Sequence, residues 1–161
     1  MWIQNVALSD IKKGFHIPPG ENAMLIQIAD PATFFPVPKH TFKEVHQFEF
    51  LDAEDGDRFP DECMIQDEQA AELVRLLHHA LDNSMNVLVH CHAGICRSGA
   101  VVEVGSMMGF TPTERFRMPN LRVKHRMMRV LGLTYDSEEK QEAINGVMTS
   151  SGIVLPKGEW E

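Results

Sequence analysis

Short apolar runs and helical spacings alternate along the chain and divide it into strands and helices. Runs rich in apolar and β-branched side chains predict four strands, at residues 2–8, 24–28, 45–51 and 86–89. The third run alternates apolar with polar side chains, which is typical of a strand with one exposed face. Residues 11–22 contain two glycines and two prolines and are predicted to form a loop.

Helical spacing is clearest over residues 67–82, where apolar side chains recur on one face and acidic residues occupy the first turn. A second helix is predicted over residues 98–108, and because it is apolar on most sides we expect it to be central and buried. Weaker patterns predict three more helices, at residues 113–117, 121–131 and 137–147. The tail from about residue 150 contains two glycines and a proline and is expected to be weakly ordered.

Strands that alternate with helices predict an α/β fold with three layers. We expect a central, mostly parallel sheet of four or five strands flanked by helices, with the functional residues at the carboxyl ends of the strands. A length of 161 residues suits one domain with a core of its own, so residues 1–161 are expected to form a single domain.

Composition narrows the class of protein. Hydrophobic residues make up 43% of the chain and charged residues 24%, as in soluble globular proteins. The net charge of −8 argues against binding to nucleic acid or an anionic membrane, and no apolar run approaches the ~20 residues of a membrane span. Residues 1–5 lack the features of a signal peptide, and three cysteines (Cys63, Cys91 and Cys96) do not indicate a disulfide framework. We therefore expect a cytoplasmic protein.

The candidate chemistry lies in residues 87–100, where a short apolar strand is followed by a glycine-containing loop and the start of a helix. Such a loop directs backbone N–H groups and a helix N-terminus at one spot, which suits a phosphate or another oxyanion. Cys91 opens the loop and is expected to be a thiolate there. Arg97 closes it and can bind two phosphate oxygens through its planar guanidinium, and Ser98 can donate a hydrogen bond to the sulfur. A thiolate inside an anion cradle is equipped to attack phosphorus.

This segment resembles the signature loop of the cysteine-dependent protein tyrosine phosphatases, with His90-Cys91, five residues, and Arg97-Ser98. The resemblance covers about residues 24–131 and implies a catalytic core at about residues 24–132, and Ala93-Gly94 with Ile95 is most similar to the small dual-specificity branch of bacterial type. It implies a phosphatase that acts on phosphotyrosine and on phosphoserine or phosphothreonine in protein substrates, without a metal or other cofactor. The implied phosphate-binding residues are those of the loop: His92, Ala93, Gly94, Ile95, Cys96 and Arg97.

The resemblance also implies a general acid, an aspartate on a loop after a strand. Three candidates follow the third predicted strand: Asp52, Asp55 and Asp57. We favour Asp52, because Phe50-Leu51-Asp52 resembles the strand-then-aspartate pattern of the small bacterial-type members, and the other two stay open. In the implied cycle Cys91 forms a cysteinyl-phosphate while Asp52 protonates the leaving group, and Asp52 then activates the water that hydrolyses the intermediate.

Three further residues have implied or open roles. By the resemblance, His90 is a buried, structural support of the loop and of the ionised cysteine. Pro119-Asn120-Leu121 resembles another motif of these phosphatases, in which Asn120 orders the loop beside the site; a cap for the helix at 121 is the alternative. For Cys96, a disulfide with Cys91 on oxidation and a plain loop-filling role are both open.

Charge is unevenly distributed in the sequence. Residues 52–68 hold eight acids and only Arg58, whereas residues 114–129 hold six basic residues and only Glu114. Such blocks are usually solvated faces. A sharper hypothesis is that the acidic block lies over the site and disfavours acidic phosphopeptides.

Three other functions compete with a phosphatase. The first is a phosphate-binding module of the same fold without catalysis. The second is a rhodanese-like sulfurtransferase, which also uses a cysteine in an anion loop. The third is a zinc site, for which the sequence offers His90, Cys91, His92 and Cys96, with Cys63 or His78-His79 to complete a set, although this spacing suits zinc poorly.

Overall fold

A single parallel sheet organises the computed structural model, which describes residues 1–133. Its five strands lie in the order β3-β2-β4-β1-β5, and all neighbours are parallel. The strands are β1 (Trp2–Ala7), β2 (Ala23–Ala29), β3 (Glu44–Glu49), β4 (Asn86–Cys91) and β5 (Thr111–Pro112). The prediction of an α/β fold with a central parallel sheet flanked by helices is confirmed.

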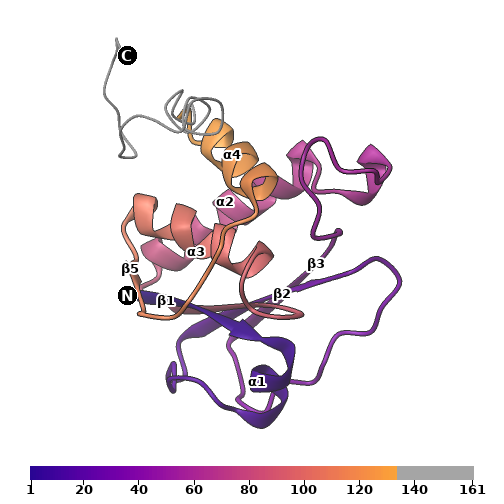
Figure 1. Cartoon of the computed structure of the whole chain (residues 1–161). Helices are drawn as coiled ribbons and strands as arrows, with labels where there is room; N and C mark the ends of the chain where they lie inside the picture. The colour runs from indigo at the N-terminus through magenta and orange to yellow at the C-terminus, as the bar shows by residue number, and fades with distance from the viewer. Residues whose placement is uncertain (134–161) are drawn as a thin grey trace.

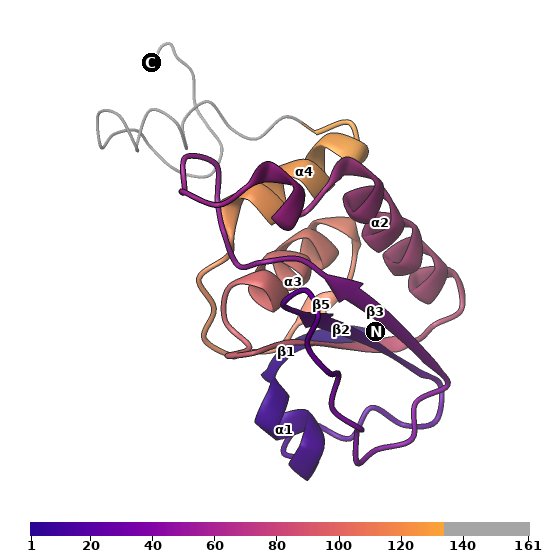
Figure 2. The same ribbon diagram turned by 90° about the vertical axis from the view of Figure 1, so that its right-hand side faces the viewer.

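Helices cover both faces of the sheet, but unequally. Figure 1 shows α2 (Asp67–Asp82), α3 (Arg97–Met108) and α4 (Leu121–Val130) on one face and the short α1 (Leu8–Lys13) on the other, and Figure 2 shows the same layers from the side. A short 3₁₀ turn, η1 (Asp61–Cys63), precedes α2. The main core lies between the sheet and α2, α3 and α4, while a smaller core beneath α1 contains Val6, Ile11, Leu25 and Leu88.

Burial explains why these strands could be predicted from the sequence. All seven residues of β2 are buried, and so are the last five of β4, because both strands are covered on both faces. A continuous apolar run is the expected pattern for such strands. In the edge strand β3, exposed residues occupy every second position, but the exposed set includes the apolar Val45, so burial follows the alternation in its sequence only in part.

Some predicted elements differ from the structure. The predicted helix over residues 113–117 is wrong: Glu114 lies in a bend, the residues after it have no regular secondary structure, and the two arginines of the segment pair with Asp10 and Glu103. The predicted loop over residues 11–22 begins too early, because α1 occupies residues 8–13 and buries only one apolar side chain, Ile11, which leaves no helical period to detect. The predictions for residues 137–147 and for the tail from about 150 lie outside the described residues.

The N-terminal strand is part of the sheet interior. β1 lies between β4 and β5, although the family resemblance begins only at about residue 24. It contributes the fully buried Asn5 at the carboxyl end of the sheet. The sheet therefore starts at Trp2, and the assignment of residues 1–161 to one domain stays a prediction. Among residues 1–133, every helix is too short or too polar to cross a membrane.

Candidate active site

The loop between β4 and α3 sets the position of the candidate nucleophile. β4 ends at Cys91, whose side chain is 3% exposed, and α3 begins at Arg97 after five loop residues. The Cys91 Sγ lies 3.2 Å from the Oγ of Ser98, in the first turn of α3. The structure thus brings together the cysteine and the serine that the sequence predicted, and it holds the sulfur at the N-terminus of a helix, where negative charge is stabilised.

Arg97 is buried and anchored through one of its nitrogens. Its Nη1 donates to the Oδ1 of Asp30 at 2.8 Å and to the carbonyl oxygen of Phe50 at 2.7 Å. Its Nε is buried and has no hydrogen-bond partner among the described residues. A buried N–H without an acceptor is costly. An oxyanion bound in the loop would supply that acceptor, which is how arginine commonly recognises phosphate.

The turn of the loop depends on Gly94. This glycine has a φ of 73°, and a Cβ placed on it would lie 2.3 Å from the carbonyl carbon of Val6. The backbone of β1 therefore occupies the space that any side chain would need. Asn5 adds a hydrogen bond between β1 and the loop, because its Nδ2 donates to the carbonyl oxygen of Gly94 at 2.7 Å.

Backbone hydrogen bonds hold the loop from both sides. On the β1 side, the N–H of Leu8 donates to the carbonyl oxygen of His92 at 3.2 Å. On the other side, the N–H of Met118 donates to Ile95 at 3.2 Å and that of Asn120 to Cys96 at 3.0 Å. The loop is thus fixed by segments from both ends of the described chain.

Asp52 lies beside this loop. Its Oδ1 accepts a hydrogen bond of 2.8 Å from the Nδ2 of Asn120, which also donates to the carbonyl oxygen of Ala53 at 3.1 Å. Burial raises the pKa of the Cys96 thiol, and the negative charges of Asp52 and Cys91 raise it further. Asp52 and Cys91 are therefore both within electrostatic reach of the same loop residue. Asn120 also caps α4, because its Oδ1 accepts from the N–H of Val123 at 3.0 Å.

The other two candidate acids have different contacts. Asp55 pairs with the Nη1 of Arg122 at 2.7 Å. The Oδ2 of Asp57 accepts from the backbone N–H of Glu54 at 2.7 Å and closes a local turn. Of the three aspartates, Asp52 is the one that these contacts connect to the loop of residues 92–96.

Arg122 is a buried charged residue whose contacts the sequence did not predict. Its side chain is 1% exposed; its Nε and Nη2 donate to the carbonyl oxygen of Ile65, and its Nη1 contacts Asp55 and Asp61. Hydrogen bonding and charge from Arg122 lower the pKa of Asp61. The acidic block 52–68 and the basic block 114–129 are therefore partly paired with each other. The opposite charge of the two blocks was the available signal.

Asp30 and Asn5 were also missed, because neither belongs to a local motif. Asp30 follows β2 and reaches Arg97 across the carboxyl end of the sheet, and Asn5 reaches Gly94 from β1. Parallel strands bring their carboxyl ends to one edge. A polar residue directly after a predicted strand could therefore have identified Asp30, whereas Asn5 lies within β1 and only a polar residue in an otherwise apolar strand could have identified it.

His90 is fully buried, as the resemblance implied. Its Nδ1 lies 3.4 Å from the carbonyl oxygen of Cys91, and its Nε2 has no partner among the described residues. Burial lowers the pKa of His90 from 6.5 to about 4; the charge of Arg97 adds to this effect, and the contact with the Cys91 carbonyl opposes it. His90 is therefore neutral at pH 7.

The lowered pKa of His90 predicts that the free energy of unfolding decreases as the pH falls. Between about pH 6.5 and 4 the unfolded chain binds a proton that the folded chain does not. The free energy of unfolding should thus fall with decreasing pH by up to about 1.4 kcal/mol per pH unit across this window. Urea unfolding at several pH values measures the slope. His90→Asn should reduce it, whereas His78→Asn, at an exposed position on α2, should not; equal slopes in all three proteins would contradict the prediction.

The alternative zinc set does not assemble in the described part of the chain. Among residues 1–133, no group of three or more histidine, cysteine or acidic side chains is placed to hold a metal ion. The three cysteines are all free thiols, with Cys91 buried and the other two partly exposed.

Comparison with known proteins agrees with this site. Residues 59–108 match the family model described as "Polymorphic toxin system, DSP-PTPase phosphatase", and the matched segment contains α2, β4, the loop and α3. No curated protein matches the sequence at a significant level.

Among solved structures, the human tyrosine phosphatase-like serine/threonine/tyrosine-interacting protein has a similar fold, with 20% sequence identity and a TM-score of 0.52 over 89% of this chain and 92% of that chain. The active form of Tk-PTP has 14% identity and a TM-score of 0.40 over 90% of each chain. The fold is thus of the protein tyrosine phosphatase class. Residues 59–108, which include Cys91, Arg97 and Ser98, are similar to a dual-specificity-type phosphatase family over that segment.

Proposed function

We propose that this protein is a protein phosphatase that hydrolyses phosphotyrosine, and also phosphoserine and phosphothreonine, through a cysteinyl-phosphate intermediate. The observation that carries the proposal is the pairing of the Cys91 Sγ with the Ser98 Oγ at 3.2 Å, beside a buried Arg97 whose Nε has no protein acceptor. A nucleophile and an oxyanion-binding group are thus both supplied at the start of α3.

In the first step, the Cys91 thiolate attacks phosphorus in line with the leaving oxygen. The S–P bond forms as the P–O bond breaks, and the carboxylic acid of Asp52 gives its proton to the leaving oxygen. The Arg97 guanidinium and the backbone N–H groups of the loop stabilise charge on the phosphoryl oxygens.

In the second step, the Asp52 carboxylate takes a proton from a water molecule that attacks the phosphocysteine. The S–P bond breaks, inorganic phosphate leaves, and the Oγ of Ser98 donates a hydrogen bond to the departing sulfur. Side chains and backbone supply every group in this cycle, so we propose that it needs no cofactor. Because the nucleophile must stay reduced, we also propose a cytoplasmic location.

An assay of the wild-type protein tests the function. Para-nitrophenyl phosphate and three peptides that carry phosphotyrosine, phosphoserine or phosphothreonine are the substrates, and release of inorganic phosphate is measured. We expect turnover of all four. Phosphate binding without turnover would favour the non-catalytic module, and thiosulfate-to-cyanide sulfur transfer without phosphate release would favour the rhodanese-like alternative.

A matched pair of variants tests the general acid. Asp52→Asn should lower kcat for the phosphoserine peptide by about 100-fold, because an alkoxide is a poor leaving group without a proton. The effect on para-nitrophenyl phosphate should be smaller, because its leaving group is more acidic. Asp55→Asn removes a carboxylate from the same loop but not from the contact with Asn120, and should change kcat less than about threefold. A larger loss in Asp55→Asn would contradict the assignment.

A further inference from the structure

A segment without regular secondary structure carries exposed apolar side chains and contacts the loop of residues 92–96. Phe116 is 69% exposed and Met118 is 62% exposed, and we call these two residues the apolar strip. The arginines beside them point to the protein: Arg115 pairs with Asp10 at 2.9 Å and Arg117 with Glu103 at 2.7 Å. The side chains of Phe116 and Met118 lie mostly in solvent instead.

The apolar strip is fixed to the loop by hydrogen bonds. The N–H of Met118 donates to the carbonyl oxygen of Ile95 at 3.2 Å. The carbonyl oxygen of Phe116 accepts from the Nδ2 of Asn5 at 3.0 Å, and the same nitrogen donates to Gly94. The strip therefore keeps a constant position beside the residues that form the phosphate site.

The exposed surface of the strip is apolar rather than cationic, because the ion pairs with Asp10 and Glu103 neutralise its two arginines. Large apolar side chains that stay in water beside a functional site are typical of a binding surface.

We propose that the apolar strip binds a side chain next to the phosphorylated residue of a protein substrate, and so selects phosphopeptides with bulky apolar flanking residues. The inference rests on the proposed function. Once a phosphoryl group is held between Cys91 and Arg97, the neighbouring residues of an extended peptide, spaced about 3.4 Å apart, must cross the rim of the loop. A peptide is the occupant rather than an anionic membrane, because the net charge of −8 disfavours anionic lipids.

Steady-state kinetics with paired phosphopeptides test the proposal. The two peptides carry the same phosphotyrosine and differ only in their flanking residues, which are leucine in one and serine in the other. Wild-type kcat/KM should favour the leucine peptide by about tenfold, since part of each apolar side chain leaves water. In Phe116→Ser/Met118→Ser this preference should fall to less than about twofold, while turnover of para-nitrophenyl phosphate is unchanged.

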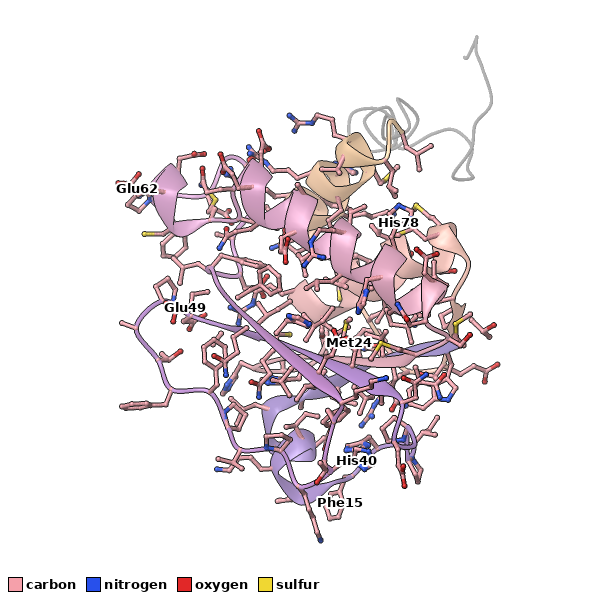
Figure 3. The ribbon with its side chains drawn as sticks, turned by 180° about the vertical axis from the view of Figure 1, so that it is seen from behind. Phe15, Met24, His40, Glu49, Glu62 and His78 are labelled. Atoms are coloured by element: carbon pink, nitrogen blue, oxygen red, sulfur yellow. The ribbon has the colours of Figure 1, made fainter. Side chains whose placement is uncertain are left out.

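The control is Phe15→Ser/Met107→Ser, which removes the same two side-chain types from positions that are 63% and 46% exposed. Phe15 lies on the α1 side of the sheet (Figure 3), and Met107 lies at the end of α3 opposite the phosphate loop. This variant should keep the wild-type preference. Thermal melts of both double variants check that each is folded.

The outcomes separate the two proposals. Turnover of para-nitrophenyl phosphate without a flank preference, or a preference that survives loss of the strip, would overturn this inference and leave the phosphatase intact. Strip-dependent self-association in gel filtration, or strip-dependent binding to neutral or anionic vesicles without a flank preference, would also overturn it. Absence of any phosphatase activity in the wild type would instead overturn the proposed function.

Discussion

Serine in place of Cys91 is expected to abolish phosphate-ester turnover, with kcat for para-nitrophenyl phosphate lowered by about 10⁴-fold or more. A serine hydroxyl at this position has no adjacent base to remove its proton, since His90 is neutral, buried and directed at the Cys91 carbonyl. The loop should keep its shape, because contacts from Asn5, Met118 and Asn120 hold it without using the sulfur.

Two measurements separate lost chemistry from lost structure. Calorimetric titration with inorganic phosphate should show that Cys91→Ser binds the anion with nearly the wild-type affinity, because Arg97 and its anchors Asp30 and Phe50 are unchanged. Cys63→Ser, which replaces a free thiol outside the loop, should keep the wild-type kcat. Residual turnover within tenfold of wild type in Cys91→Ser would exclude Cys91 as the nucleophile.

The fold could be predicted where one local pattern determines an element. The helix predicted over residues 67–82 coincides with α2, because sixteen residues give the apolar period room to repeat. β2 and β4 could be predicted because burial on both faces of the sheet makes them continuously apolar. α1 and β5, with six and two residues, are too short to show a period, and their structure depends on the sheet beside them.

The candidate site divides in the same way. Cys91, Arg97 and Ser98 could be predicted because one strand, one loop and one helix place them within a few residues of each other. The residues that support that loop come from distant parts of the chain. Local sequence patterns do not indicate which distant segments come into contact. Arg122 is the clearest case: in the sequence it is one of several arginines in a basic block, yet folding buries it against Ile65 and two acids.

The wrong helix over residues 113–117 has a tertiary cause. Its residues have no strong breaker between Pro112 and Pro119, so a helix was a reasonable prediction from the sequence alone. Arg115 and Arg117 instead pair with Asp10 and Glu103, and Asn5 holds the carbonyl oxygen of Phe116. These long-range contacts stabilise the non-helical form, in which Phe116 and Met118 are exposed.

Gly94→Ala is expected to have the largest effect on stability, with a loss of about 3 kcal/mol or more in the free energy of unfolding. Two costs combine at this position. An alanine with a φ of 73° is strained wherever it lies, and its Cβ would overlap the backbone of β1, 2.3 Å from the carbonyl carbon of Val6. Because that contact is with backbone rather than a flexible side chain, the loop itself must shift.

Gly132→Ala separates these two costs. Gly132 has a similar φ of 79°, but nothing lies within 4 Å of a Cβ placed there. Its substitution should therefore cost only the backbone strain, about 1 kcal/mol. Urea unfolding of both variants measures the difference, which reports the close approach of β1 to the phosphate loop. A shifted loop should also lower kcat/KM by about 100-fold in Gly94→Ala and leave it unchanged in Gly132→Ala. Equal losses of stability in the two variants would show that the loop can move away from β1 at little cost, and that the site is less rigid than its contacts indicate.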